Sequence, residues 1–564
     1  MPVRAFNFNA IKTQKIGRTA FDLSHSVKGS FPMGKFIPLV LQECVPGDRF
    51  KVQVHQLSRL MALISPMFHD VDIHLDAFYQ PSRLLMKDFD NFWTGGESGT
   101  EAPTVPQVNL GDIYDHNYDW LKPGSLFSYL GVPSPLKYDN ATGTWVFDDS
   151  IPVDGDRLTQ LPNISLLPLN MYISIYNEYV RDETIQPKLP LFDEAKVYTA
   201  NEIANAIDDA GYDADEFMTC YHRDWVKDYF TSALPDPQRG NAVGVPFADT
   251  GDIKINNPEL EVDNIQGHGG PLSVDNLQVG EDAAKMYATY SNVDSYIKSL
   301  TGEADISNLS TVSIIGLRTA FAIQKVLERL NVSGGRVQEA TLALFNEWVP
   351  DERLQKPLRL SSSRCPIMIS EVETNAETGG LVVGDLAGKA KSRGSFRPFK
   401  LKCVEFGYMM ICVSIMPKPG YLQGLNRLWT RFDRWDMYNP YTQFIGEQSV
   451  KNQELYVDYT LLDYDKTADD WNKKDFGYQA RFSDMKFNPD RIVGDMQTSL
   501  AHWHMARMFK QRPGLNNVFL ECNPTDRVFA VQNDVSDQKV LGEFYIQMIA
   551  SRKMSRFSTP KLLG

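Results

Sequence analysis

Apolar and polar residues alternate in several short segments near the two ends of the chain. In the clearest one, VDIHLDAFY from Val71 to Tyr79, apolar side chains fall on one face and Asp72, His74 and Asp76 on the other. A period of two is typical of a strand that buries one face. This segment therefore predicts a β-strand against a core.

A turn between two apolar segments predicts a β-hairpin. Phe36–Cys44 and Phe50–Gln56 are joined by Pro46-Gly47-Asp48. Pro presets the first central position of a turn, and Gly supplies the positive φ of the second. Further strands are predicted at Ile367–Val372, Cys403–Met416, Glu454–Thr460, Asn517–Glu521, Arg527–Val531 and Glu543–Ala550.

Helices are predicted between the β-rich ends. Thr311–Leu330 carries an apolar stripe near helical period, and Ser333-Gly334-Gly335 is a stop signal. Leu169–Arg181 and Tyr221–Phe230 are predicted as shorter helices with aromatic faces. Because unpaired strand edges invite aggregation, we expect strands from both ends to complete the same sheets.

Residues 236–310 differ from both flanks. They are rich in Asn, Asp, Gly and Pro, and carry twelve acidic residues against Arg239, Lys254, Lys285 and Lys298. Such a long polar stretch inside a compact domain is usually a functional excursion. We interpret residues 236–310 as a surface loop inserted into one body. The first part of this body is formed by residues 1–235, which include an N-terminal arm. The second part is formed by residues 311–564, which end in a basic C-terminal tail.

The composition is that of a globular protein, with 564 residues, 43% of them hydrophobic and 23% charged. The longest nearly apolar run, Phe406–Met416, is about half the roughly 20 residues that span a bilayer, so no membrane insertion is expected. Met1–Ala10 lacks the apolar core of a secretory leader. The six cysteines are scattered without a C-x-x-C pair, which favours free thiols.

Basic residues gather at the chain ends although the formal net charge is -14. Residues 1–60 hold nine basic and three acidic side chains, and residues 551–564 hold basic side chains without an acid. Segregated charge is expected where one surface faces a polyanion. The predicted nucleic-acid-facing residues of the two ends are Arg4, Lys12, Lys15, Arg18, Arg552 and Lys553.

A third basic cluster lies within residues 389–402, which contain no acid. Cations interleaved with aromatic rings are what sequence-tolerant single-strand binding uses. The alternative is a solvated loop that enters a strand. The basic residues are Lys389, Lys391, Arg393, Arg397, Lys400 and Lys402, and the rings are Phe396 and Phe399.

Signatures of catalysis are missing from the sequence. The motifs G-x-S-x-G and H-E-x-x-H are absent. The phosphate-binding loop around Lys389 is incomplete, because Val383 replaces its first Gly and Ala390 replaces its Ser or Thr. His502-Trp503-His504 has no third metal ligand nearby. We therefore predict no catalytic residue, no metal site and no cofactor, and expect a protein that is not an enzyme.

Taken together, these segments resemble a known family, the major capsid protein of Microviridae, and most closely its gokushovirus branch. The resemblance runs in order along most of the chain and departs in residues 90–160 and 236–310. It is carried by FDLSHSVKGSFPMGKFIPLVLQECVPGDRFKV (Phe21–Val52), AFYQPSRLL (Ala77–Leu85), Asn170–Gln186, DYFTSALPDPQRG (Asp228–Gly240), Leu317–Arg329, Pro350–Leu360, PGYLQGLNRLWTRFDRWDMYNP (Pro419–Pro440), Ile445–Val457 and Phe476–Met496.

The resemblance implies a mainly β fold, a single eight-stranded antiparallel jelly roll of the viral capsid type with inserted helices and long loops. It implies a homo-oligomer of about sixty copies in an icosahedral T=1 shell around circular single-stranded DNA. Implied partners are a small DNA-binding protein, a pilot protein, an internal scaffolding protein and a host cell-surface receptor, with assembly in the bacterial cytoplasm. The 236–310 insertion would meet its symmetry mates at a threefold axis through Val245, Phe247, Tyr287 and Tyr290.

The segment Arg427–Tyr441 interleaves arginines with aromatic residues. Both residue types are enriched at the centres of protein–protein interfaces, although a role inside one chain is an equal alternative. The candidate subunit-interface residues are Trp429, Arg431, Phe432, Arg434, Trp435 and Tyr438.

Two other function classes stay open at this point. A cytoplasmic single-stranded nucleic-acid-binding protein would use the N-terminal arm and the 389–402 cluster, but the net charge of -14 weighs against it. A jelly-roll carbohydrate-active enzyme would need a pair of acidic catalytic residues, and the adjacent acids at 208–209 and 469–470 are typical of solvated positions. Closed shells in the electron microscope would favour the capsid reading.

Overall fold

The structure is a computed structural model that describes residues 17–97, 100–101, 103–140, 142–151, 160–240, 278–279, 286–287, 314–333, 336–373, 386–460, 470–530 and 537–556. The chain divides into two compact units, one formed by Met1–Arg239 and Glu328–Gly564 and the other by Gly240–Leu327. In the second unit, β11 (Gln278–Val279) pairs with β12 (Met286–Tyr287). Helix α8 (Ile314–Ser333) contains the sequence boundary between the two units. It confirms the helix predicted at Thr311–Leu330.

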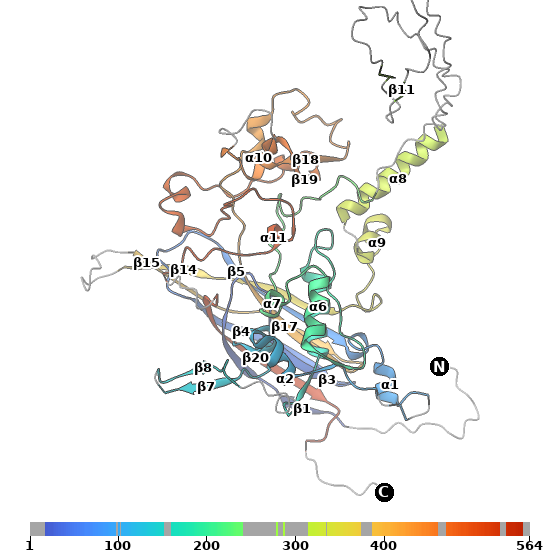
Figure 1. Cartoon of the computed structure of the whole chain (residues 1–564), viewed down its shortest axis with the longest axis vertical. Helices are drawn as coiled ribbons and strands as arrows, with labels where there is room; N and C mark the ends of the chain where they lie inside the picture. The colour runs from blue at the N-terminus through green and yellow to red at the C-terminus, as the bar shows by residue number, and fades with distance from the viewer. Residues whose placement is uncertain are drawn as a thin grey trace, which may run out of the picture. The chain divides into compact units, whose positions relative to one another are not determined.

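Two antiparallel sheets form the centre of the first unit (Figure 1). The seven-stranded sheet has the order β1-β20-β4-β15-β14, with β2 beside β20 and β16 beside β4. Its strands are β1 (Thr19–Asp22), β2 (His25–Phe31), β4 (Arg49–Leu60), β14 (Met368–Glu373), β15 (Leu386–Ser395), β16 (Phe399–Lys402) and β20 (Val540–Arg552).

The second sheet has four strands in the order β13-β5-β17-β3. Both sheets combine strands from the two ends of the chain, as expected from the sequence. The strands are β3 (Ile37–Cys44), β5 (Val71–Pro81), β13 (Leu358–Pro366) and β17 (Gly407–Pro417). The predicted hairpin of Phe36–Cys44 with Phe50–Gln56 is wrong, because β3 pairs with β17 in one sheet and β4 pairs with β20, β15 and β16 in the other. The predicted turn is present, since Gly47 between the two strands has a positive φ, but it carries the chain from one sheet to the other.

Helices and minor strands fill the long connections of the chain. The helices are α1 (Phe89–Thr94), α2 (Leu110–Asn117), α3 (Leu126–Leu130), α5 (Leu167–Ile175), α6 (Ala200–Asp209), α7 (Ala214–Met218), α9 (Val337–Phe345), α10 (Asn452–Leu455) and α11 (Asn517–Leu520). Short 3-10 helices are η1 (Ser82–Leu84), η2 (Tyr118–Leu121), η5 (Arg427–Thr430), η7 (Trp471–Lys473), η8 (Ser483–Met485), η9 (Gly494–Gln497) and η10 (Ala501–Trp503), and η3 (Tyr176–Val180) is a π-helix. Minor strands are β6 (Gln107–Asn109), β7 (Leu136–Asp139), β8 (Thr144–Phe147), β9 (Asn163–Ser165), β10 (Val197–Tyr198), β18 (Glu447–Lys451) and β19 (Asp475–Ala480).

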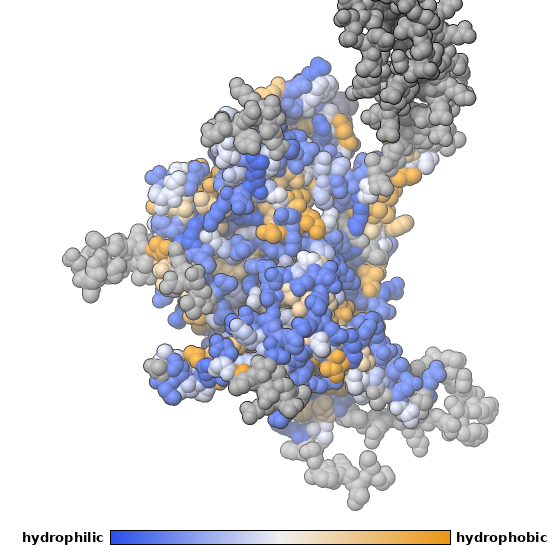
Figure 2. Space-filling model, in the orientation of Figure 1, coloured by the Kyte–Doolittle hydropathy of each residue, from blue (hydrophilic) through white to orange (hydrophobic). Residues whose placement is uncertain are grey.

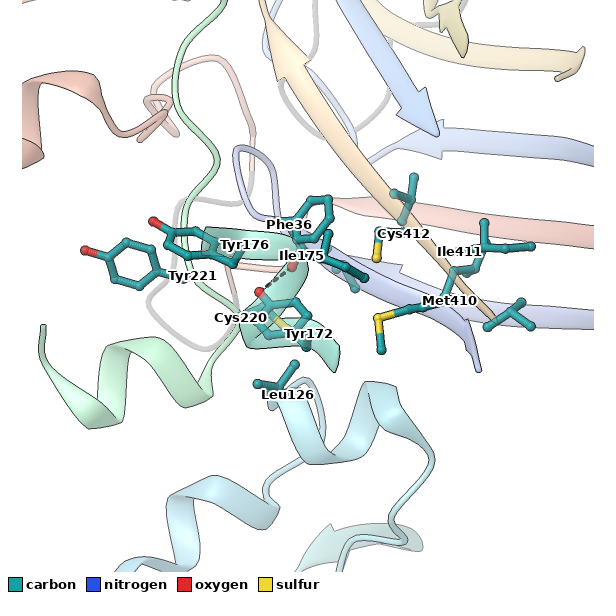
Figure 3. Close-up of a cluster of buried hydrophobic side chains, with 14 of the residues drawn as sticks. Phe36, Leu126, Tyr172, Ile175, Tyr176, Cys220, Tyr221, Met410, Ile411 and Cys412 are labelled. Atoms are coloured by element: carbon teal, nitrogen blue, oxygen red, sulfur yellow. Dashed lines mark hydrogen bonds between the residues drawn. The ribbon is translucent and has the colours of Figure 1, made fainter. Parts of the chain in front are cut away.

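The main core lies between the sheets and continues beneath the helices. Alternate residues of β4 and β20 are buried, but β17 is buried almost throughout because α5 packs against it. Figure 3 shows this side of the core, where Tyr172 of α5 lies beneath Phe36 and Tyr176 of η3 lies beside Tyr221, with a centroid distance of 5.4 Å. The Tyr172 hydroxyl donates a hydrogen bond of 2.8 Å to the Phe36 carbonyl, which satisfies a polar group inside the core.

Four further local predictions were wrong, because contacts distant in sequence determine these segments. The predicted helix Tyr221–Phe230 begins as an extended strap, in which the amide of Arg223 donates to Gly34 and its carbonyl accepts from Cys522. The predicted strand Asn517–Glu521 is mostly the one-turn helix α11, capped by the Asn516 side chain. The predicted strands Glu454–Thr460 and Arg527–Val531 are not strands where the structure describes them.

Two buried carboxyl groups near this strap differ in their electrostatics. Asp76 lies 2.8 Å from Arg223 and 3.0 Å from Arg359, and these guanidiniums lower its pKa although burial opposes ionisation. Asp224 accepts a 2.9 Å hydrogen bond from Gln186 and faces Glu521 across a β-bridge. Burial raises the pKa of Asp224 to about 7, because the nearby cation does not offset desolvation.

The Asp224→Asn variant is predicted to stabilise the protein at pH 8. The raised pKa means that the folded state binds this proton more tightly than the unfolded state, so the wild type loses stability as the pH rises through about 7. We expect the variant to gain about 2–4 kcal/mol at pH 8 and almost nothing at pH 4, measured by urea unfolding.

Asp182→Asn is the matched control, because Asp182 pairs with Lys227 and its pKa is lowered in spite of its burial. This second variant is predicted to destabilise the protein at pH 8. Equal effects of Asp224→Asn at pH 8 and pH 4 would contradict the raised pKa of Asp224.

Candidate interaction surfaces

The outward side of the seven-stranded sheet carries a basic sheet face. Exposed Lys and Arg residues alternate along the strands with buried small or apolar residues, so the cations share one side of the sheet. We define the basic sheet face by Arg49, Lys51 and Arg59 of β4, Lys389, Lys391 and Arg393 of β15, and Lys400 and Lys402 of β16.

Strand register places several of these cations directly opposite one another. Lys400 is the partner of Lys51, Lys402 of Arg49, and Lys391 of Arg59. Like charges in such cross-strand pairs destabilise a sheet. Within the described part of the chain, the cations of the basic sheet face make no ion pair with a carboxylate, so their charge is available to an external anion.

A groove of about 430 Å³ runs along this face between β16, β4 and β20. Arg49, Lys51, Lys400 and Lys402 line it together with Ile549, which is partly exposed. Farther along β4, the imidazole of His55 stacks on Tyr545 with a centroid distance of 6.3 Å. The basic sheet face therefore combines cations for phosphates in the groove with an aromatic pair for bases farther along β4.

The basic residues near the chain ends have different environments. Arg18 donates to the Gly47 carbonyl at 2.5 Å and is exposed. Arg552 lies 3.3 Å from the buried carboxylate of Asp48 and donates to the Glu43 carbonyl, so it stabilises the body of the protein. Lys553 is exposed beside Gly47, whereas Arg4, Lys12 and Lys15 lie outside the described residues.

Arg397 is exposed in the link between β15 and β16, beside the basic sheet face. Sequence reasoning identified the β15 and β16 cations but missed Arg49, Lys51 and Arg59. The two groups are more than 300 residues apart, and only strand pairing joins them. The alternation of basic residues along Arg49–Arg59 is the signal that would have suggested them.

A second surface is the aromatic segment, residues 426–445. Phe432 is 87% exposed and Tyr441 is 93% exposed, and Arg434 lies over the ring of Trp435 at 4.8 Å. Arg431 differs, since it is largely buried and bonds the carboxylate of Asp484. The exposed large apolar residues are Leu428, Trp429, Phe432, Trp435, Met437, Tyr438, Tyr441, Phe444 and Ile445.

These residues expose roughly 1,000 Å² of side-chain surface, if each contributes on the order of 100–200 Å². The largest apolar patch of a typical monomer measures only about 300–600 Å². A standard protein–protein interface buries about 800 Å² on each partner. In Figure 2, the visible face of the molecule is mainly hydrophilic, with apolar residues in limited patches.

The remaining predicted positions give little geometry. Val245, Phe247 and Tyr290 lie outside the described residues, and Tyr287 is in β12, opposite Gln278. Lys389 belongs to a strand and not to a phosphate-binding loop. The described residues contain no group of three or more potential metal ligands, and no described helix is long and apolar enough to cross a membrane.

Comparison with known proteins shows which family the chain belongs to. The family model described as Capsid protein (F protein) matches residues 9–113 and 156–562. The chain belongs to this capsid protein family. It is 28% identical to Capsid protein VP1 of Chlamydia phage 1, with 98% of this chain and 97% of the relative covered.

Two further relatives span the chain. Capsid protein VP1 of Bdellovibrio phage phiMH2K is 27% identical, covering 99% of this chain and 98% of the relative. Capsid protein VP1 of Spiroplasma virus 4 is 25% identical, with the same coverage. The predicted relationship to the Microviridae major capsid protein is confirmed, and so is a structural role in place of an enzymatic one.

The Arg552→Gln variant of this capsid protein is predicted to lose about 2–4 kcal/mol of stability, because it leaves the buried Asp48 carboxylate without its cation. Lys553→Gln, its neighbour and control, should change stability by less than about 0.5 kcal/mol. Denaturant unfolding of both variants measures the difference. Similar losses for the two variants would contradict the assigned role of Arg552.

Proposed function

We propose that this capsid protein folds as a single eight-stranded jelly roll and that about sixty copies assemble into a T=1 icosahedral shell around circular single-stranded DNA. The strand order supports the jelly roll. One sheet contains β2-β20-β4-β15 and the other β3-β17-β5-β13. Taken in chain order, these eight strands alternate between the two sheets with one exception. The exception is β5 and β13, which follow one another across the long middle of the chain and both lie in the second sheet.

In this proposal, residues 1–235 and 311–564 form the jelly-roll body, and residues 236–310 project outward to a threefold axis and to the host receptor. The net negative charge of this insertion supports the outward direction, since it would repel packaged DNA. The small DNA-binding, pilot and internal scaffolding proteins of such phages are further proposed partners. Assembly is proposed to occur in the host bacterial cytoplasm.

The exposed aromatic segment is the observation that carries the shell proposal. Exposed apolar surface of this extent is typical of sites that bind another protein. In a shell built from one kind of chain, the partner is a neighbouring copy, and the aromatic side chains supply the central contacts of the interface. The aromatic segment is held in place by Arg427, which donates to the Ser449 carbonyl at 2.8 Å.

Replacing Phe432, Tyr441 and Phe444 together by Ser is predicted to prevent shell assembly while leaving the monomer folded. The three side chains are at least 85% exposed, so their removal costs the isolated chain little. Sedimentation and negative-stain microscopy measure assembly. Val404→Ser, at a position 73% exposed elsewhere, is the control. Closed shells of normal yield from the triple variant would contradict the proposed interface.

The basic sheet face is proposed to line the shell interior and contact the DNA backbone. The basic sheet face is positively charged, although the whole chain has a net charge of -14. On the described strands of the seven-stranded sheet, the acidic residues on the same side as these cations are Asp22 and Glu543. Phosphate contacts release counterions and need no base sequence. A shell protein that encloses any genome segment requires this kind of binding.

Replacing Lys389, Lys391 and Arg393 by Gln is predicted to weaken binding of the unassembled subunit to a single-stranded oligonucleotide at least tenfold. Each lost phosphate contact should reduce the slope of log K against log salt by about 0.7. Fluorescence anisotropy at several salt concentrations measures this slope. The control replaces the exposed Arg353, Lys486 and Lys510 by Gln. Equal slopes for the two triple variants would contradict the proposal.

The family match disfavours the cytoplasmic single-stranded nucleic-acid-binding protein that the sequence alone left open, although the basic sheet face by itself would also serve that role. The two proposals differ in the native assembly. Negative-stain images of closed particles support the shell, whereas soluble monomers that coat DNA would support the alternative.

A further inference from the structure

A segment outside the family match forms a hairpin with an exposed apolar face. The family model matches residues up to 113 and resumes at 156. Within this interval, β7 (Leu136–Asp139) and β8 (Thr144–Phe147) pair as a two-stranded antiparallel sheet, which extends from the first unit in Figure 1. Isolated two-stranded hairpins are marginally stable in water, so other contacts must hold this one.

The base of the hairpin is fixed to the body of the protein. The Tyr114 hydroxyl donates to the Asp148 carbonyl at 2.9 Å and accepts from the Ile151 amide at 3.1 Å. Lys137 lies 3.0 Å from the Asp148 carboxylate and donates to the Ser150 hydroxyl at 2.8 Å. These contacts hold the hairpin in one orientation, which reduces the entropy that it loses on binding a partner.

The two faces of the hairpin differ in chemistry. Register pairs Leu136 with Phe147 and Tyr138 with Trp145, so these four side chains share one face. The other face carries Lys137, Asp139, Thr144 and Val146. Tyr118 packs against Phe147 with a centroid distance of 6.2 Å and extends the apolar face.

This apolar face is open to solvent in the single chain. Trp145 is 67% exposed, Tyr138 is 50% exposed, and their rings meet edge to face with a centroid distance of 5.4 Å. With Leu136 and Tyr118, which are also exposed, the face presents roughly 400–500 Å². That is the size of the largest apolar patch of a typical monomer, and such a patch is often functional.

We propose that the apolar face of hairpin β7–β8 binds a second copy of this chain within the shell. The inference rests on the proposed shell function, in which every subunit is surrounded by copies of itself. In the described chain β8 pairs only with β7, which leaves an apolar edge strand that would promote aggregation unless a neighbour covers it. Nucleic acid is disfavoured as the partner, because the cations near the face are already paired with carboxylates: Lys137 with Asp148 and Asp149, and Lys122, which lies over the rings of Tyr118 and Phe147, with Asp119.

The apolar face of the hairpin is small compared with a standard interface, which buries about 800 Å² on each partner. Loss of the hairpin contact should therefore weaken the particle and not abolish it. This outcome distinguishes the hairpin from the aromatic segment, whose loss is expected to prevent assembly.

The test compares two double variants. The apolar-face variant combines Tyr138→Ser and Trp145→Ser. The control variant combines Asn140→Ser, at the turn, and Thr144→Ser, on the opposite face. The apolar-face variant is expected to form shells that dissociate at a lower denaturant concentration than wild type, while the thermal midpoint of the unassembled subunit stays unchanged. The control should behave as wild type. Shells of the apolar-face variant with wild-type dissociation would overturn the inference.

A cross-linking measurement identifies the partner directly. With a photo-reactive phenylalanine analogue at position 145, irradiation of assembled particles is expected to give covalent dimers of the chain. Adsorption to host cells is measured on the same particles. Normal shells without dimers, or a variant that loses only adsorption, would overturn the second-copy assignment. A wild-type chain that forms no particle at all would instead remove the proposed shell function.

Discussion

The pairing of β20 with β4 is the contact on which the rest of the structure depends. It joins Val540–Ser551, at the end of the chain, to Arg49–Leu60 near its start, and β1 and β2 then pair with the other edge of β20. The apolar residues of both strands face the second sheet and form the core. Their opposite sides consequently form one continuous outer surface, on which the basic sheet face lies.

The accuracy of the sequence predictions follows from the range of the interactions involved. Val71–Tyr79 was predicted correctly as a strand because of its own alternation, but the prediction of one buried face holds only in its first half, since β5 is buried on both faces from Leu75 to Gln80. Tyr221–Phe230 was predicted wrongly, since its backbone partners lie near residues 34 and 522. For the same reason, the sequence predicted only part of the basic sheet face. The cluster at residues 389–402 is visible locally, whereas the cations of β4 lie beside it only through strand pairing.

The capsid protein leaves two kinds of surface uncompensated in the single chain. Like charges face one another across β4 and its neighbours, and the aromatic segment and hairpin β7–β8 expose large apolar side chains. Both arrangements are unfavourable for an isolated subunit. Each becomes favourable in a particle, where phosphates neutralise the cations and neighbouring subunits cover the rings. The assembled state is therefore the one for which this sequence is suited.

The most direct test of this account is a cryo-electron microscopy reconstruction of the assembled particle. The account predicts a closed shell in which the outer side of β4, β15 and β16 faces the interior, next to density of the packaged DNA. It also predicts that the aromatic segment is buried between neighbouring subunits. A shell with the basic sheet face on its outer surface, or with Phe432 and Tyr441 exposed to solvent, would contradict it.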